Sequence, residues 1–225
     1  MRRSAVFVVA LGAVGGWPPL LVAQGALQWD VALSGVGMRV SSVSAPTSQH
    51  LSGAVFGLQG QITFLRRITL DLGYWQGQLD PSSGAVGTAS RDMVEGYAMI
   101  GARPFGWLSL RAGPHAWTYI SNAGTQRWFL WEARARAQSE VVAEVHSYIE
   151  LWDVLSASVN VPQGFQSGFG GEGGLILRLR DAPIIPEKYP ARLRLAYGIE
   201  RVRMGGGIRT EIMDRLSLSL GIEHR

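Results

Sequence analysis

The chain contains 225 residues, 47% of them hydrophobic, with no cysteine and a formal net charge of +4 at pH 7. A chain of this length without a polar linker or a shift in composition is expected to form one domain. The absence of cysteine excludes disulfide bonds, thiolate metal sites and a lipid-modified N-terminal cysteine.

The cations are almost all arginines, and they alternate with apolar residues along the chain instead of gathering in one basic patch. A basic patch is typical of nucleic-acid binding, so we expect no nucleic-acid partner. Arginine pairs with carboxylates through two parallel hydrogen bonds, which favours a filled or narrow polar interior.

Residues 1–25 have the three parts of a secretory signal peptide. Arg2 and Arg3 form a basic start, an apolar run follows, and Ala23 and Gly25 lie three and one positions before a cleavage point. The residues around the arginine pair do not fit the longer twin-arginine motif. We therefore expect Sec-type export and a mature domain of residues 26–225.

In the mature domain, apolar residues recur at every second position in short segments. No run there approaches the roughly 18 to 20 consecutive apolar residues of a membrane helix, so the alternation predicts β-strands. In chain order the predicted strands are 28–40, 54–64, 68–75, 93–103, 108–112, 128–152, 154–161, 175–180, 191–200, 206–212 and 216–223. Turns are predicted at 65–67, 151–153 and 213–215, and Pro114 predicts a bulge after 108–112.

The segment 128–152 is the most informative of these, because it alternates without a break. One side carries small apolar residues such as Ala133, Ala135 and Val141, and the other carries a ladder of glutamates and arginines. A strand of a soluble sandwich usually places its charges singly in water. A ladder of charges needs a wet or internally paired interior, which a closed barrel in a bilayer supplies.

These segments number eleven, whereas single-chain bacterial barrels nearly always have an even number of strands. The segment 128–152 would be about 76 Å long when extended, and a membrane strand needs only about 9 to 11 residues. A turn near Gln138 to Glu140 would divide it and give twelve strands, the number we favour. A single strand projecting beyond the membrane is the alternative, and the barrel would then have ten.

The signal peptide, the alternating strands and phrases such as Met213-Asp-Arg-Leu-Ser-Leu-Ser-Leu resemble the small outer-membrane β-barrels of Gram-negative-type bacteria. The resemblance implies an all-β, closed antiparallel transmembrane barrel of about 10 to 12 strands in the outer membrane. It also implies lipid as a partner and insertion by the barrel-assembly machinery. Members usually end in an aromatic residue, whereas this chain ends Gly-Ile-Glu-His-Arg, which raises the question of how the last strand closes.

The charged faces of the strands predict a lumen that is either plugged by ion pairs or lined as a narrow, porin-like passage. The predicted lumen-lining residues are Glu95, Arg111, Glu132, Arg134, Arg136, Glu140, Glu144, His146, Arg178, Arg180, Arg192 and Arg194. The main hypothesis is therefore a non-enzymatic barrel with a structural or narrow-pore role. A secreted soluble β-barrel that binds a ligand is one alternative.

A barrel enzyme acting on lipid, a hydrolase or acyltransferase, is the other alternative. His146 shares a face with Glu144 and Glu150, and Ser156 or Ser158 on the next predicted strand could be its nucleophile. A lumen filled with glutamate and arginine also hydrogen-bonds a histidine that has no catalytic role, so we predict no catalytic site. No pair of histidines has metal-ligand spacing, and we predict neither a metal nor a cofactor.

The tryptophans form a further pattern. Those at positions 29, 75, 107, 117, 128, 131 and 152 mostly lie near predicted strand ends, where the aromatic girdles of a membrane barrel are expected. Packing in the protein interior is the alternative for each of them, and for Trp75 and Trp117 the two interpretations are evenly balanced.

Overall fold

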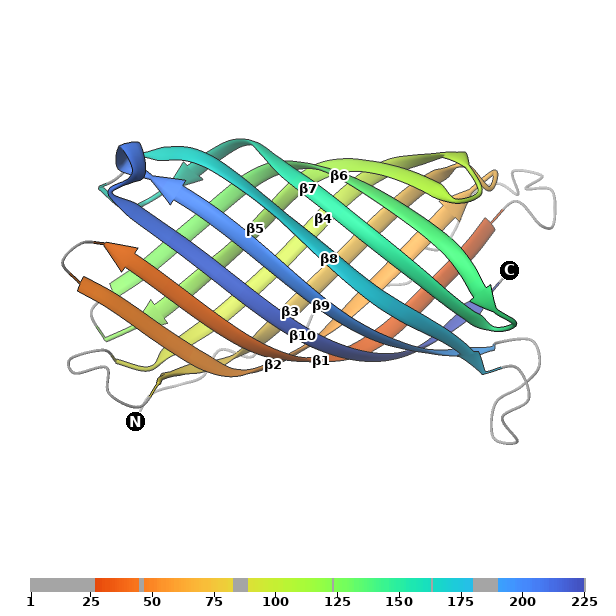
Figure 1. Cartoon of the computed structure of the whole chain (residues 1–225), viewed down its shortest axis with the longest axis horizontal. Coiled ribbons are helices and arrows are strands. Elements are labelled where there is room, and N and C mark those ends of the chain that lie inside the picture. Colours follow the sequence, from red (N-terminus) through yellow and green to blue (C-terminus); the bar gives the residue numbers. More distant parts are fainter. Residues whose placement is uncertain are drawn as a thin grey trace, which may run out of the picture.

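The computed structural model describes residues 27–44, 47–82, 89–122, 124–162, 164–179 and 190–224. These residues form a closed antiparallel barrel of ten strands, in which each strand pairs with its neighbours in sequence and β10 pairs with β1 (Figure 1). The strands are β1 (Leu27–Ser44), β2 (Thr47–Phe64), β3 (Ile68–Pro81), β4 (Arg91–Phe105), β5 (Leu108–Ser121), β6 (Gly124–Val142), β7 (Val145–Val159), β8 (Phe165–Leu179), β9 (Ala191–Met204) and β10 (Arg209–His224).

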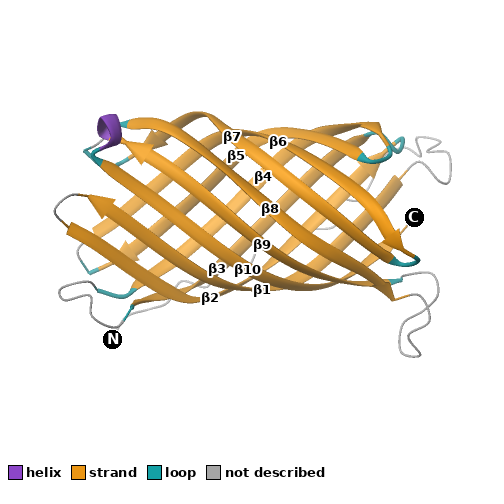
Figure 2. Ribbon diagram, viewed as in Figure 1, coloured by secondary structure: helices purple, strands orange, loops and turns teal. Residues whose placement is uncertain are grey.

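The strands are tilted and the barrel has two distinct ends. At the terminal end, β1 begins and β10 finishes, whereas the distal end carries the short 3-10 helix η1 (Gly205–Gly207) between β9 and β10 (Figure 2). Within the described part of the chain, no helix is long and apolar enough to span a membrane.

The barrel has ten strands, so the favoured number of twelve is wrong. Residues 151–153 lie inside β7 and residues 213–215 lie inside β10, where turns were predicted. The long alternating run does contain a turn, but at Ala143 and Glu144 instead of 138–140. Polar residues suggested turns at 151–153 and 213–215, yet both segments keep the strict in–out alternation of a strand.

The last strand closes the barrel without an aromatic C-terminal residue. β10 pairs with β1 in one unbroken register that runs from Trp29 opposite His224 to Ser44 opposite Arg209. The rings of Trp29 and His224 stack at the terminal end, with their centroids 5.8 Å apart.

Pro114 does not produce the predicted bulge. The register between β4 and β5 is the same on both sides of it, because Tyr97 is opposite His115 and Ile100 is opposite Ala112. The irregularity in this pair of strands lies instead between Ala102 and Phe105, next to the turn. The ladder therefore accommodates the missing N–H of proline without an inserted residue.

Each face of the sheet changes polarity part-way along the strands. In the terminal half of β10, Leu216, Leu218 and Leu220 are exposed, and the residues between them face inward. In its distal half the order reverses, because Met213 is buried inside while Asp214 faces outward. The terminal half is thus apolar outside and polar inside, whereas the distal half has an apolar interior and an outer face that mixes polar residues with exposed apolar ones such as Phe129 and Leu155.

Three regions follow from this reversal, and they are used below by name. The apolar belt consists of exposed outward residues of the terminal half, including Val31, Leu33, Phe56, Leu58, Leu72, Ile100, Leu110, Ile149, Leu151, Leu175, Leu195, Ile199, Leu216, Leu218 and Leu220. The polar collar consists of exposed outward residues of the distal half, including Arg39, His50, Gln76, Gln78, Asp80, Asp92, Arg127, Asp153 and Arg203. The apolar plug fills the distal interior with Val36, Met38, Val40, Leu51, Val55, Leu79, Met93, Trp117, Tyr119, Trp128, Leu130, Val154, Val202, Met204 and Met213.

The tryptophans divide between these regions. Trp131 and Trp107 are about half exposed, as expected for a girdle, and Trp107 stacks on Phe105 with centroids 5.8 Å apart at the terminal end. Trp117 and Trp128 are only 1% exposed, because they lie inside the plug. Trp75 packs against the plug, so the girdle interpretation is wrong for Trp75, Trp117 and Trp128.

Candidate functional site

The terminal half of the barrel encloses a chamber with a volume of about 420 Å³. Its inner limit is the apolar plug, represented by Val36, Met38 and Val55, and its lining extends to Gln28 and Trp107 near the terminal end. The chamber therefore has one closed end and one end directed toward the terminal rim. Its walls carry most of the charged side chains of the interior.

Glu150 on β7 is the centre of the largest ion-pair cluster in these walls. It is only 3% exposed and accepts hydrogen bonds from Arg111 on β5 and from Arg136 on β6, the latter at 2.6 Å. Arg134 contributes a third, longer contact of 3.5 Å, and Arg111 also donates to Asp71 at 3.1 Å. A single carboxylate thus contacts three guanidinium groups, two of which also pair with the carboxylates of Asp71 and Glu132.

His115 on β5 lies deeper, next to the plug, and is 1% exposed. Its Nδ1 lies 2.7 Å from Oε1 of Glu132, and its Nε2 lies 2.9 Å from Oε1 of Glu95. Arg134 holds the other oxygen of Glu132 through two hydrogen bonds, of 2.9 and 2.6 Å. Arg215, from the opposite wall, donates to Glu95 at 2.5 Å.

A third cluster surrounds Arg194 on β9 and connects opposite walls of the chamber. Arg194 pairs with Glu172, donates to the hydroxyl of Tyr148 at 2.5 Å and donates to the amide oxygen of Gln59 at 3.0 Å. The guanidinium of Arg136 lies over the ring of Tyr148, 4.3 Å from its centroid. Planar guanidinium groups suit this combination of ion pairing and ring stacking.

The predicted lumen residues fall into three groups. Those on the inward face are Glu95, Arg111, Glu132, Arg134, Arg136, His146, Arg178, Arg192 and Arg194, and each of them forms a hydrogen bond or ion pair with another lumen side chain. Arg180 lies outside the described residues.

Glu140 and Glu144 lie at the terminal rim of the barrel instead of among its buried charges. Glu140 is exposed near the terminal end of β6, and Glu144 lies in the β6–β7 turn with a left-handed φ of 67°. Glu140 still belongs to β6 and is opposite inward-facing His146, whereas Glu144 belongs to the two-residue turn, through which the alternation of the sequence continues.

Other interior residues were missing from the predicted set. Glu150 was indicated by the alternation of its strand, since it lies between the outward residues Ile149 and Leu151, whereas Glu200 follows outward Ile199 but precedes Arg201. Arg215 was hidden by the turn wrongly predicted at 213–215. The contact of Arg215 with Glu95 joins β10 to β4 across the barrel, and no spacing within one strand predicts such a pair.

The serine–histidine arrangement considered for a lipid enzyme does not form. Ser156 and Ser158 are exposed, and a register shift in β7 next to Ser156 places them on the outside. His146 is buried inside near the other end of the same strand, and ten residues of strand correspond to roughly 33 Å. That alternative is therefore wrong for these residues.

Solved structures similar to this chain are bacterial outer-membrane barrels. The outer membrane protease OmpT from Escherichia coli has a TM-score of 0.49 at 9% identity, over 90% of this chain and 97% of that one. Neisserial surface protein A has a TM-score of 0.38 at 12% identity, over 86% and 96% of the two chains. The attachment invasion locus protein Ail of Yersinia pestis has a TM-score of 0.32 at 8% identity, over 86% and 97%.

No family model and no curated protein matches the sequence. The likenesses to solved structures concern the shape of the barrel alone, and the activities of those proteins belong to them.

Proposed function

We propose that this protein is a non-enzymatic outer-membrane barrel that is closed to diffusion through its lumen and carries a polar chamber open toward one side. The observation that supports this proposal is the apolar plug. Its core members Leu79, Trp117, Trp128, Leu130 and Val202 are between 0 and 1% exposed, so the distal interior is packed like the core of a soluble protein.

Two contacts show how densely the plug is filled. The rings of Trp117 and Trp128 stack with centroids 5.4 Å apart and an interplanar angle of 17°. Next to them, Tyr119 on β5 donates a hydrogen bond of 3.0 Å to Glu211 on β10, across the barrel. An apolar constriction without water is a barrier to ions, because an ion that enters it loses its hydration shell.

The outer surface supports placement in a bilayer. The belt exposes large apolar side chains, among them Leu33 at 67%, Phe56 at 66% and Ile100 at 65%. A soluble protein rarely exposes a continuous apolar surface of this extent, so this observation disfavours the soluble ligand-binding barrel. In our proposal the belt contacts the lipid, and the polar collar projects into water beyond it.

The orientation follows from the strand number and from the route of insertion. An even number of strands leaves both ends of the barrel domain on the same side. A chain that is exported with a signal peptide and inserted by the assembly machinery from the periplasm keeps these ends in the periplasm. The chamber would then face the periplasm, and the plug and the collar would face the cell exterior.

Planar-bilayer recording of the purified barrel tests the proposal. The wild type should give no channel events, whereas Trp128→Ala should open a path through the plug and produce ion conductance. Trp131→Ala is the matched control, because it removes an exposed ring from an outward position three residues along the same strand and should remain silent. A wild type that conducts steadily would contradict the closed-barrel proposal and support the narrow pore.

A further inference from the structure

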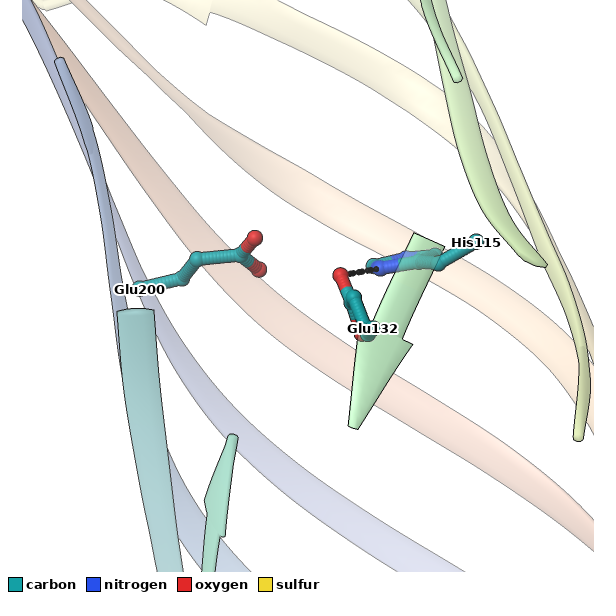
Figure 3. A group of neighbouring side chains, drawn as sticks. All are labelled: His115, Glu132 and Glu200. Atoms are coloured by element: carbon teal, nitrogen blue, oxygen red, sulfur yellow. Dashed lines mark hydrogen bonds and ion pairs between the residues drawn. The ribbon is translucent and has the colours of Figure 1, made fainter. Parts of the chain in front are cut away.

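We infer that His115, Glu132 and Glu200 form a binding site for one divalent transition-metal ion, of which Zn²⁺ is the best-suited representative. The three residues come from β5, β6 and β9, and one ligand atom of each lies within 4.8 Å of the other two. Figure 3 shows the carboxylate of Glu200 directed across the lumen toward Glu132 and His115. This inference does not depend on whether the barrel conducts ions.

Glu200 is the residue that points to a ligand. It is 1% exposed, and neither of its carboxylate oxygens has a hydrogen-bond partner among the described residues. Its Oε2 makes a long ionic contact of 3.5 Å with Nη2 of Arg215. A buried carboxylate without hydrogen bonds is costly, and a coordinated cation would remove that cost.

The other two ligands are arranged so that one metal ion could join them. Oε1 of Glu132 faces Nδ1 of His115, while Oε2 is already held by the two hydrogen bonds from Arg134. A cation would take the place of the proton between Nδ1 and Oε1, and the contact between Glu132 and Arg134 would be kept. Ion binding therefore requires the loss of the hydrogen bond between Nδ1 and Oε1, and also of the longer contact of 3.4 Å between Nη2 of Arg134 and Nδ1.

Glu95 acts as a positioning residue behind the histidine. Its Oε1 accepts a hydrogen bond of 2.9 Å from Nε2 of His115, which leaves Nδ1 as the nitrogen that faces the metal site. A carboxylate in this position orients the ring of a metal-ligating histidine and increases its basicity. Arg215 in turn holds Glu95 at 2.5 Å.

Charge and donor type define the ion. Once the ion has displaced the proton between Nδ1 of His115 and Oε1 of Glu132, Glu95, Glu132 and Glu200 supply three negative charges against two positive ones from Arg134 and Arg215, so the cluster has a net negative charge for the cation. A set of one imidazole nitrogen and two carboxylate oxygens suits Zn²⁺, which binds three protein ligands and a water in open sites. Ca²⁺ and Mg²⁺ prefer ligand sets made only of oxygen.

The ion has an access route through the chamber. Glu95, Glu200, Arg134 and Arg215 belong to the chamber lining, which extends from the plug toward the terminal end. A bound ion would connect β5 and β6 with β9 on the facing wall. It would therefore also stabilise the barrel against unfolding, because it binds only the folded arrangement.

The experiment is calorimetric titration of the folded, metal-stripped barrel in detergent with Zn²⁺, and with Ca²⁺ for comparison. We expect one equivalent of Zn²⁺ and much weaker Ca²⁺ binding. Glu95→Gln should weaken Zn²⁺ binding by roughly 10- to 100-fold, and Glu200→Gln, which removes a ligand, should weaken it more. Glu172→Gln changes another interior carboxylate, one that is paired with Arg194, and should leave the affinity unchanged.

Substitution with Co²⁺ provides a second measurement on the same proteins. Its visible absorption should show low-coordinate nitrogen and oxygen ligation in the wild type and lose this signature in Glu200→Gln, even where the variant is less stable. The inference is overturned if the wild type binds no Zn²⁺, if Glu200→Gln binds as tightly as the wild type, or if His50→Gln or His224→Gln abolishes binding instead. Equal affinity for Ca²⁺ would overturn the assigned class of metal.

Discussion

Arg215 on β10 reaches across the lumen to Glu95 on β4, and its Nη1 lies 2.5 Å from Oε1 of Glu95. These strands are not neighbours in the barrel, so the contact joins opposite walls. The hydrogen bond of Tyr119 with Glu211 also joins opposite walls, and that of Arg194 with Gln59 joins β9 to β2, which are separated by β10 and β1. The interior is therefore held by contacts through the lumen as well as by the strand ladders.

A double-mutant cycle on this pair measures the contribution of the cross-lumen contact. Arg215→Met and Glu95→Gln should each lower the free energy of unfolding, because each removes an ion pair from the lumen, while Glu95 keeps its bond to His115 and Arg215 its contact with Glu200. The double variant should lose less than the sum, with a coupling energy of about 0.5 to 3 kcal/mol. Urea unfolding in lipid vesicles gives these values. Additive losses would show that the two side chains do not interact.

The apolar belt and the polar collar predict different responses to the same substitution on one strand. Leu72 and Gln76 both face outward on β3, but Leu72 belongs to the belt and Gln76 to the collar. Leu72→Arg should destabilise the inserted barrel by roughly 2 to 4 kcal/mol if this residue lies near the bilayer midplane. Gln76→Arg should have almost no effect, because its side chain remains in water. Equal losses in vesicle unfolding would place the membrane boundary elsewhere.

Much of the barrel could be predicted from the sequence, because alternation with period two is a local property. Leu193, Leu195 and Ile199 face outward and Arg192 and Arg194 face inward, as their order in the chain indicates. The strand number could not be obtained in this way. In a barrel whose lumen accepts charge, a polar residue such as Asp153 or Arg215 is as acceptable inside a strand as in a turn.

The apolar plug and the proposed metal site could not be predicted from the sequence, for a different reason. Alternation assigns residues to two faces of a strand, but it does not show which face is inside when the apolar residues move from one face to the other. This happens in β10, where Met213 faces inward and Leu216 faces outward. The cluster of His115, Glu132 and Glu200 depends on the register and closure of the whole barrel. Spacing arguments are restricted to ligands on one strand or in one turn, so they could not detect it.

Glycines on the inward face make room for aromatic rings, which gives a prediction for β8. A Cβ at Gly170 would lie 2.4 Å from the ring of Trp152 and 2.6 Å from the carbonyl oxygen of Ile199, which cannot move freely. Gly170→Ala should therefore cost about 1 to 3 kcal/mol of stability. Gly173→Ala, on the outer face of the same strand, has its nearest neighbour at 3.8 Å and should be tolerated. Thermal unfolding of both variants in one detergent is the measurement.

Removal of the ion pairs should lower the stability of the barrel, but it should not open the lumen to ions while the plug is intact. Replacing Arg134 and Arg136 together with Met removes contacts from Glu132 and Glu150, both of which are buried. The barrel should lose stability, because buried carboxylates then lack counter-charges.

The same double variant should remain silent in planar bilayers, because the apolar plug lies beyond these residues and is unchanged. Arg66→Met, in the exposed turn between β2 and β3, is the control and should affect neither property. Conductance of the Arg134 and Arg136 double variant with an intact Trp117 and Trp128 stack would show that the ion pairs close the lumen. Stability equal to the wild type would instead show that these arginines do not compensate the interior carboxylates.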